Sequence, residues 1–292
     1  MTIALLGTGL LGSAIASRLL ACGQPVTVWN RNPERCLPLE AMGAHRAPTP
    51  AEAASQADWL ITVLSDGPTT QSVLLDQVSS QLIGRRVIQI GTISPAESQF
   101  LAAAVLERGG RYLEAPVLGS RPEALNGTLQ LMVGGARELV QEAMPLLSQL
   151  SQEPVHLGEV GSAMTAKLAL NQLIASLTHA FSLSLHLVQQ GGVAVEPFMT
   201  LLRSSALYAP TFDKKLEREL SADYSNPNFP TAHLRKDLNL FITSAQAAGL
   251  NSEGLDGLAA LLERATAAGL DSLDYCALHA LTAGQTAAVT PD

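Results

Sequence analysis

Cysteine is scarce in this sequence. Its 292 residues include three cysteines, Cys22, Cys36 and Cys276, which are widely spaced and odd in number. A disulfide framework needs paired cysteines, and a metal cluster needs ligands at short, regular spacing. We therefore expect ordinary thiols in a reducing compartment, the cytoplasm, and no metal site.

Basic side chains are also few. Lys and Arg number 18 against 26 for Asp and Glu, which gives a formal net charge of -8. Such a chain has no field that attracts a polyanion, so we expect no nucleic-acid partner. A small acidic substrate would need a local basic site.

Long hydrophobic runs are missing as well. The most apolar stretch, Met164–Val188, is interrupted by Lys167 and Asn171, whereas a membrane span wants about 18 apolar residues without polar breaks. The run Met1–Leu6 has no basic flank and meets Gly7 at once, which predicts a strand and not a signal peptide. We expect no membrane partner.

A glycine motif follows the first strand pattern, Ile3–Leu6, and precedes the helical run Ser13–Ala21. Strand, glycine turn and helix form the context that a dinucleotide-binding fingerprint requires, with the helix N-terminus facing the phosphates. A purely structural glycine turn is the alternative. The predicted cofactor-binding residues of this turn are Gly7, Thr8, Gly9, Leu10, Leu11 and Gly12.

The second strand pattern, Pro25–Trp29, ends in Asn30 and Arg31. An NAD-selective site would place a carboxylate there for the ribose hydroxyls. Asn30 removes that carboxylate, and an arginine can pair a 2′-phosphate, so the pair favours NADPH. Arg31 as a simple turn residue before Pro33 is the alternative.

Further strands and helices alternate along the first half of the chain. We expect helices at Ala51–Gln56, Thr69–Leu75 and Pro95–Arg108, and strands at Trp59–Leu64, Arg86–Ile90, Tyr112–Val117 and Pro154–Leu157. This alternation predicts an α/β fold with a doubly wound parallel sheet of the Rossmann type.

Ligands of such sheets bind at the carboxyl ends of the strands. Leu64, Ser65 and Thr92 follow two of these strands and are predicted to face the cofactor. The hydroxyl of Thr92 is the best placed for the nicotinamide ribose. The segment Ser94–Glu97 also reads as an ordinary helix start, which alone could account for its loop.

Gly119, Ser120 and Arg121 follow the next strand, ahead of a hairpin return at Gly127–Met132. Exposed amides in such a loop can hold a carboxylate, with the arginine as the nearby cation. We therefore predict that these three residues bind the substrate. A connecting loop with a structural glycine is the alternative.

A polar stripe crosses the apolar helix predicted from Ser162 to Gln190. Lys167 and Asn171 are four residues apart, and Thr178 and Ser182 repeat that spacing further on, so all four share one side of the helix. The apolar residues elsewhere predict burial on most sides, including burial against a second subunit in a homodimer or homotetramer.

The second half shows helical patterns without strand alternation. They lie at Val195–Leu202, Thr211–Leu220, Thr231–Ala248, Ser252–Ala267 and Leu273–Leu281. With 47% hydrophobic residues, the chain is large enough for two domains. We predict an NADP-binding Rossmann domain over residues 1–161 and an all-α substrate and dimerisation domain over residues 162–292.

Four blocks of sequence, in this order and spacing, resemble the β-hydroxyacid dehydrogenase family. They are Gly7–Gly12 with Val28–Arg31, Glu114–Ser120 with Gly127–Leu129, Gly158–Asn171, and Lys236–Leu238. The family contains 3-hydroxyisobutyrate dehydrogenases and tartronate semialdehyde, glyoxylate and succinic semialdehyde reductases. The loop from Gly119 to Glu123 resembles that of the glyoxylate/succinic semialdehyde reductases most.

The resemblance implies Lys167 as the catalytic acid, Asn171 as its substrate-orienting neighbour and Lys236 near the nicotinamide end of the cofactor. For Asp237 we expect a helix-pairing role without chemistry. One departure is Leu118, which stands where the family usually has serine, so a hydroxyl for the substrate carboxylate is missing and the amides of Gly119 and Ser120 remain.

The predicted function is NADPH-dependent reduction of a small carboxylate-bearing aldehyde, such as glyoxylate or succinic semialdehyde, to the hydroxy acid. Hydride reaches the aldehyde carbon while the Lys167 ammonium stabilises and protonates the carbonyl oxygen. The alternatives are a 3-hydroxyisobutyrate or tartronate semialdehyde-type dehydrogenase, an imine reductase, which Lys167 argues against, and a non-catalytic dinucleotide-binding protein.

Overall fold

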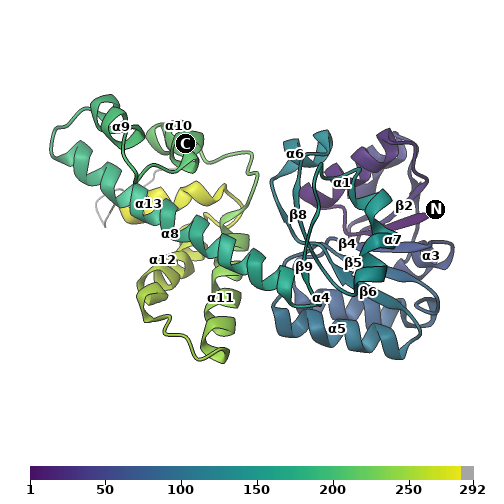
Figure 1. Cartoon of the computed structure of the whole chain (residues 1–292). Helices are drawn as coiled ribbons and strands as arrows, with labels where there is room; N and C mark the ends of the chain where they lie inside the picture. Colours follow the sequence, from purple (N-terminus) through teal and green to yellow (C-terminus); the bar gives the residue numbers. More distant parts are fainter. Residues whose placement is uncertain (284–292) are drawn as a thin grey trace. The chain divides into compact units, whose positions relative to one another are not determined.

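A mostly parallel sheet of nine strands organises the first part of the chain in the computed structural model, which describes residues 1–283 (Figure 1). The strand order is β3-β2-β1-β4-β5-β6-β8-β7, with β9 beside β8. The strands are β1 (Ile3–Leu6), β2 (Val26–Trp29), β3 (His45–Arg46), β4 (Trp59–Thr62), β5 (Arg86–Gln89), β6 (Arg111–Glu114), β7 (Val117–Leu118), β8 (Gln130–Gly134) and β9 (Val155–Gly158). The doubly wound prediction is confirmed.

The antiparallel part of the sheet is the predicted hairpin return. Strand β8 runs antiparallel to β6 and β7, whereas β9 is parallel to β8. The strand predicted over Tyr112–Val117 is divided into β6 and β7, and Pro116, which cannot donate a ladder hydrogen bond, lies at the break.

Helices cover both faces of the sheet, because successive residues of a strand point to opposite sides. Ile3 and Leu5 of β1 belong to one hydrophobic cluster, and Ala4 and Leu6 belong to the other. The helices are α1 (Leu10–Ala21), α2 (Leu37–Glu40), α3 (Pro50–Ser55), α4 (Gly67–Gln71), α5 (Pro95–Glu107), α6 (Arg121–Asn126) and α7 (Arg137–Leu147). Helix α4 continues as a π-helical segment, Ser72–Gln77.

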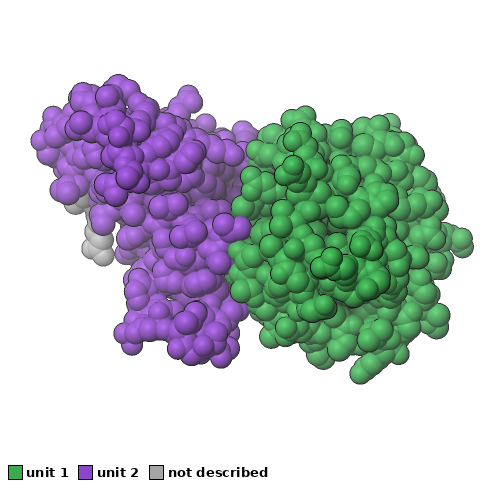
Figure 2. Space-filling model, viewed as in Figure 1, with its two compact units in different colours: residues 1–168 green, residues 169–292 purple. Residues whose placement is uncertain are grey.

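Contacts divide the chain into two compact units, Met1–Leu168 and Ala169–Asp292 (Figure 2). Helix α8 (Ser162–Gln190) begins in the first unit and continues into the second. The division therefore falls between Lys167 and Asn171. The predicted boundary, between residues 161 and 162, coincides with the start of α8.

The polar stripe of α8 is buried as predicted: Lys167 is 9% exposed, and Asn171, Thr178 and Ser182 are less exposed still. The expected burial of the helix on most sides is wrong within this chain, because Leu173, Leu183 and Leu187 are half or more exposed. No described residue covers these leucines enough to bury them.

By length and composition, α8 would also fit a membrane span, and 39% of its most apolar window is buried in this fold. Core helices of soluble proteins meet the same criterion, so the fit is weak evidence. The absence of a membrane partner stays a prediction.

Helices make up the second unit, as predicted, together with one isolated bridge between Pro230 and Asp274 among its described residues. They are the rest of α8, α9 (Val195–Arg203), α10 (Pro210–Ser221), α11 (Thr231–Ala247), α12 (Asp256–Ala267) and α13 (Leu278–Thr282). Helix α11 packs against α12 around Leu234, Leu238 and Leu262. Short 3₁₀ turns precede α12 and α13, where the sequence predicted uninterrupted helices.

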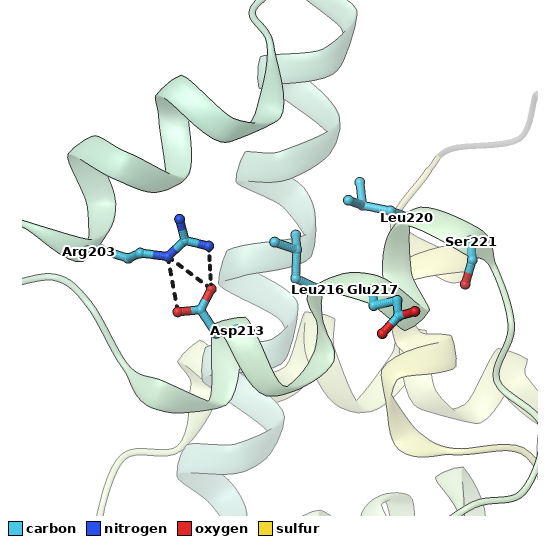
Figure 3. Close-up of a pocket in the computed structure, with 6 residues that line it drawn as sticks. All are labelled: Arg203, Asp213, Leu216, Glu217, Leu220 and Ser221. Atoms are coloured by element: carbon cyan, nitrogen blue, oxygen red, sulfur yellow. Dashed lines mark hydrogen bonds and ion pairs between the residues drawn. The ribbon is translucent and has the colours of Figure 1, made fainter.

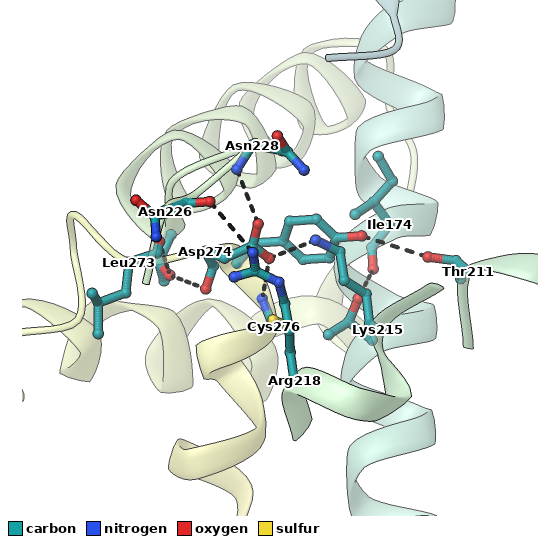
Figure 4. A network of polar contacts seen from close by, with 12 residues as sticks. Ile174, Thr211, Lys215, Arg218, Asn226, Asn228, Leu273, Asp274 and Cys276 are labelled. Atoms are coloured by element: carbon teal, nitrogen blue, oxygen red, sulfur yellow. Dashed lines mark hydrogen bonds and ion pairs between the residues drawn. The ribbon is translucent and has the colours of Figure 1, made fainter. Parts of the chain in front are cut away.

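A buried ion pair holds the loop that leads into α11 (Figure 4). The Nζ of Lys215 lies 2.7 Å from Asp274, whose carboxylate also accepts the amide of Asn228. Burial raises the pKa of Asp274 and the Lys215 bond lowers it, and the bond prevails, so this pKa lies below its usual value. The pair stabilises the start of the helix that carries Lys236.

Candidate active site

The glycine turn between β1 and α1 needs glycine at two positions for packing. Gly7 has a φ of +104°, and a Cβ there would lie 2.3 Å from the carbonyl oxygen of Val63. A Cβ on Gly12 would lie 2.0 Å from the carbonyl oxygen of Gly7. Neither position accepts a side chain. The two glycines therefore allow the close packing of strand and helix that the fingerprint requires.

Gly9 differs, because a Cβ there would meet no atom within 4 Å. It is the N-cap of α1, no side chain caps it, and the first turn of α1 carries no acidic residue. The helix N-terminus therefore keeps its amide donors and positive dipole end for an anion. The space beside Gly9 and these amides fit a dinucleotide pyrophosphate.

Asn30 fastens the glycine turn to the end of β2. Its Oδ1 accepts the amide of Thr8 at 3.1 Å, and its Nδ2 donates to the carbonyl oxygen of Asn32 at 2.9 Å. Arg31, next to it, is exposed. Asn30 thus shapes the turn as well as replacing a carboxylate, and Arg31 is the group available to a ribose phosphate.

The loops after β4 and β5 touch at their backbones. A Cβ on Gly91 would lie 2.5 Å from the carbonyl oxygen of Leu64, so Leu64 and the Thr92 loop lie together at the carboxyl edge of the sheet. Ser65 donates its hydroxyl to Asp66, the N-cap of α4. The structure places Leu64 against Gly91, the residue before Thr92, whereas the Ser65 hydroxyl serves a helix cap.

The segment after Thr92 is the helix start that the sequence indicated. Ser94 and Glu97 form a capping box at α5, with the Ser94 amide 2.7 Å from Glu97 Oε2 and the Glu97 amide 3.1 Å from Ser94 Oγ. This cap explains the serine and the glutamate, and Thr92 remains the cofactor-facing candidate of the loop.

The loop predicted to hold the substrate carboxylate contains a carboxylate of the chain itself. The amide and the hydroxyl of Ser120 donate to Glu123 Oε2 at 2.7 and 2.8 Å, which forms the capping box of α6. Gly119, with a φ of +111°, and Arg121 are both exposed. Gly119 and Arg121 carry the other donors of this loop.

Glu114, at the end of β6, binds the start of α8. Its side chain is fully buried, and its Oε1 accepts the amides of Gly161, Ala163 and Met164 at 2.9, 2.8 and 3.0 Å. Lys167 follows one turn later in the same compact unit. The proton donor implied by the family resemblance therefore belongs to the unit that carries the glycine turn.

Asn171, Asp237 and Lys236 form a second group in the helical unit. Asn171 Nδ2 donates to Asp237 Oδ2 at 2.5 Å, and Lys236 Nζ lies 2.9 Å from Asp237 Oδ1. Asp237 is buried, whereas about a quarter of the Lys236 side chain is exposed. Asp237 therefore contacts two predicted site residues. The helix-pairing role expected for it does not include these contacts.

Sequence reasoning missed the parts played by Glu114, Glu123 and Asp237. A signal existed for two of them. Glu114 is a charged residue at the end of an otherwise buried strand, and Ser120 with Glu123 has the Ser-x-x-Glu spacing of a capping box.

A surface hollow of about 530 Å³ lies elsewhere, on α9 and α10 (Figure 3). Its lining includes Arg203, Asp213, Leu216 and Leu220. Two guanidinium nitrogens of Arg203 donate hydrogen bonds to the Asp213 carboxylate. The hollow contains none of the predicted site residues, so we assign it no part in the chemistry.

Comparison with known families matches almost the whole chain. Residues 2–165 match the family described as the NAD binding domain of 6-phosphogluconate dehydrogenase. Residues 161–282 match the family described as NAD-binding of NADP-dependent 3-hydroxyisobutyrate dehydrogenase. The two matches meet at the start of α8.

A relative agrees with these matches, and solved structures share the fold. Glyoxylate/succinic semialdehyde reductase 1 of Arabidopsis thaliana is 30% identical over 281 residues, which cover 95% of this chain and 97% of that protein. A structure of 3-hydroxyisobutyrate dehydrogenase from Mycobacterium tuberculosis with L-serine has a TM-score of 0.86 at 24% identity, covering 96% of this chain and 98% of that one. For an imine reductase from Myxococcus stipitatus in complex with NADP⁺, the TM-score is 0.66 at 22% identity, with coverage of 96% and 99%.

Proposed function

Because the chain belongs to the family of NAD(P)-dependent hydroxyacid dehydrogenases, we propose that it is an NADPH-dependent reductase of small aldehyde acids. It is an oxidoreductase that acts on CH–OH groups and uses a nicotinamide dinucleotide. The proposal adds the direction, NADP over NAD, and glyoxylate or succinic semialdehyde as the substrate.

The observation that carries the proposal is the presence of two features in one compact unit. The open, uncapped glycine turn at Gly9 offers donors for a dinucleotide, and Lys167 is buried in the first turns of α8. The family resemblance gives this buried lysine the task of protonating the substrate oxygen.

The chain's own residues would act as follows. Bound NADPH supplies the hydride. Amides of the α1 N-terminus bind its pyrophosphate, and Arg31 pairs its 2′-phosphate. Lys167 Nζ places a positive charge against the carbonyl oxygen, stabilises the developing alkoxide and gives it a proton.

The substrate carboxylate is assigned to the Gly119 and Arg121 donors, because Glu123 uses the amide and hydroxyl of Ser120. Leu118 contributes no hydroxyl. Asn171, held by Asp237, orients the substrate. The similarity to the Arabidopsis reductase supports glyoxylate and succinic semialdehyde over other acids.

A panel of substrates tests the proposal. Oxidation of NADPH is measured with glyoxylate, succinic semialdehyde, tartronate semialdehyde and a cyclic imine, and reduction of NADP⁺ is measured with 3-hydroxyisobutyrate. We expect the highest kcat/KM for one of the first two with NADPH. Preference for 3-hydroxyisobutyrate, for tartronate semialdehyde or for the imine would replace the proposal with the corresponding alternative. No turnover despite NADPH binding would indicate a non-catalytic dinucleotide-binding protein.

We further propose that the protein forms a homodimer or homotetramer through α8. The exposed Leu173, Leu183 and Leu187 are apolar surface on a long helix, which a second copy would bury. Light scattering should give two or four times the chain mass, and a monomer at micromolar concentration would contradict this assignment.

A further inference from the structure

Glu114 is a buried acidic residue of the nucleotide-binding unit. The side chain is fully buried, at the carboxyl edge of the sheet, between β5 and β8. A buried carboxylate is stable only when hydrogen bonds replace its water. Here both oxygens have such donors, and the donors come from two directions.

One oxygen, Oε1, accepts three amides of the segment that opens α8: Gly161, Ala163 and Met164. The first amides of a helix have no partner within it, and the positive end of the helix dipole favours an anion there. Glu114 is thus a cap supplied by a strand far from the helix in sequence.

The other oxygen, Oε2, accepts the hydroxyl of Ser98 on α5 at 2.5 Å. Ser98 Oγ in turn lies 2.9 Å from the hydroxyl of Tyr112 on β6. This chain of polar groups is buried and holds the carboxylate in one orientation.

The backbone around the carboxylate is shaped to admit it. A Cβ on Gly134 would lie 2.6 Å from Glu114 Oε1, and Gly161, the first of the donating residues, has a φ of +104°. Glycine at these two positions lets the sheet edge and the α8 start approach one carboxylate closely.

Lys167 lies four residues after Ala163 and three after Met164, so its side chain leaves the helix on the side of the two capped amides. Three hydrogen bonds to one oxygen hold the first turn of α8 in place. Each later residue of a helix is rotated by about 100° and raised by about 1.5 Å. The position of the first turn therefore sets the direction and height at which Lys167 leaves the helix.

We infer that Glu114 is a positioning residue for Lys167, which sets the place of the proton donor within the nucleotide-binding unit by capping α8. The inference rests on the proposed function of Lys167.

Two conservative variants separate geometry from charge. Glu114→Gln keeps an oxygen for the three amides and removes the negative charge. Glu114→Asp keeps the charge on a side chain that is one methylene shorter, so it cannot reach all donors at the same backbone position. Glu52→Asp is the matched control, because Glu52 takes part in the cap of α3, in the same unit but without a link to Lys167.

For Glu114→Asp we expect kcat to fall roughly 10- to 100-fold, the range that a misplacement of about 1 Å produces, with the Kd of NADPH unchanged. For Glu114→Gln we expect most of kcat to remain. The Kd of NADPH should again be unchanged, because Gln still offers an oxygen to the three amides. Glu52→Asp should leave both properties as in the wild type.

The inference is overturned if Glu114→Asp keeps the wild-type kcat while Lys167→Ala is inactive; the proposed function then stands. It is also overturned if both Glu114 variants lose NADPH binding and unfold together, since the residue would then be structural only. Wild-type turnover of Lys167→Ala would be a failure of the proposed function itself.

Discussion

The side-chain amide of Asn171 donates a hydrogen bond to the carboxylate of Asp237, 2.5 Å away and 66 positions further along the chain. The same carboxylate pairs with Lys236. One buried acid therefore fixes the orientation of a predicted substrate-binding amide and holds a predicted cofactor-facing lysine. Asn171 is on α8 and Lys236 is on α11, two separate helices of the helical unit.

Removing this acid tests its role. Asp237→Ala removes one hydrogen-bond acceptor of the buried Asn171 amide, which should lower the free energy of unfolding by about 1–3 kcal/mol and reduce kcat/KM. Urea denaturation and steady-state kinetics measure the two effects. Asp237→Asn retains an acceptor and should recover much of the stability. If Lys236→Ala reproduces the full loss of Asp237→Ala in both measurements, the bond to Asn171 is unimportant.

The glycine turn allows a paired test of cofactor binding. Gly9→Ala should fold as well as the wild type, because its Cβ enters open space, yet bind NADPH at least tenfold more weakly, since that space fits the pyrophosphate. Gly12→Ala should instead lose stability, because its Cβ would lie 2.0 Å from the Gly7 carbonyl oxygen. Thermal melts and NADPH fluorescence titrations distinguish the two effects. Equal NADPH affinity in Gly9→Ala and the wild type would contradict the assigned site.

Arg31 should determine the preference between the two nicotinamide cofactors. Arg31→Ala removes a charge-assisted contact with the 2′-phosphate and should raise the KM for NADPH roughly 10- to 100-fold, with little effect on NADH. Arg35→Ala, an exposed arginine one turn further, is the control. A parallel loss with both cofactors would mean that Arg31 only shapes the turn.

Glu219, buried on α10 beside Ser182, predicts a pH-dependent stability. Burial raises its pKa from 4.5 to about 8, although Ser182 and Lys215 oppose the shift. The folded state thus retains a proton that the unfolded chain releases, and the free energy of unfolding falls as the pH rises from about 4.5 to about 8. His279, 3.6 Å away, has its pKa lowered to about 4 by burial and by His186, and acts oppositely, between about 4 and 6.5.

Glu219→Gln should therefore be more stable than the wild type above pH 8, by about 1–3 kcal/mol, and the advantage should vanish near pH 5. Urea midpoints across this pH range measure the difference. Glu217→Gln, on the same helix but exposed, should follow the wild type at every pH. A constant difference between Glu219→Gln and the wild type would rule out titration as its cause.

The sequence predicted what local patterns determine. The glycine turn, the alternation of strands and helices and the capping box at Ser94 each lie within a short segment, and the structure confirms them. Helix α7 was missed although its buried residues Leu139, Val140, Ala143, Leu146 and Leu147 recur at helical spacing.

The remaining errors concern distant contacts. Glu114 meets the start of α8 about 50 residues away, and Asp237 meets Asn171 across 66. No periodicity along the chain reports such pairs, because the fold brings them together. Leu187 is exposed although its helix is apolar. An apolar helix face in the sequence does not show which surface covers it.

The central claim is that Lys167 is the proton donor, and the most direct test is the turnover of Lys167→Ala beside its affinity for NADPH. We expect the variant to bind NADPH nearly as the wild type does and to lose at least about a hundredfold in kcat, as removal of a general acid does. Wild-type-like turnover of glyoxylate or succinic semialdehyde by Lys167→Ala would contradict the claim.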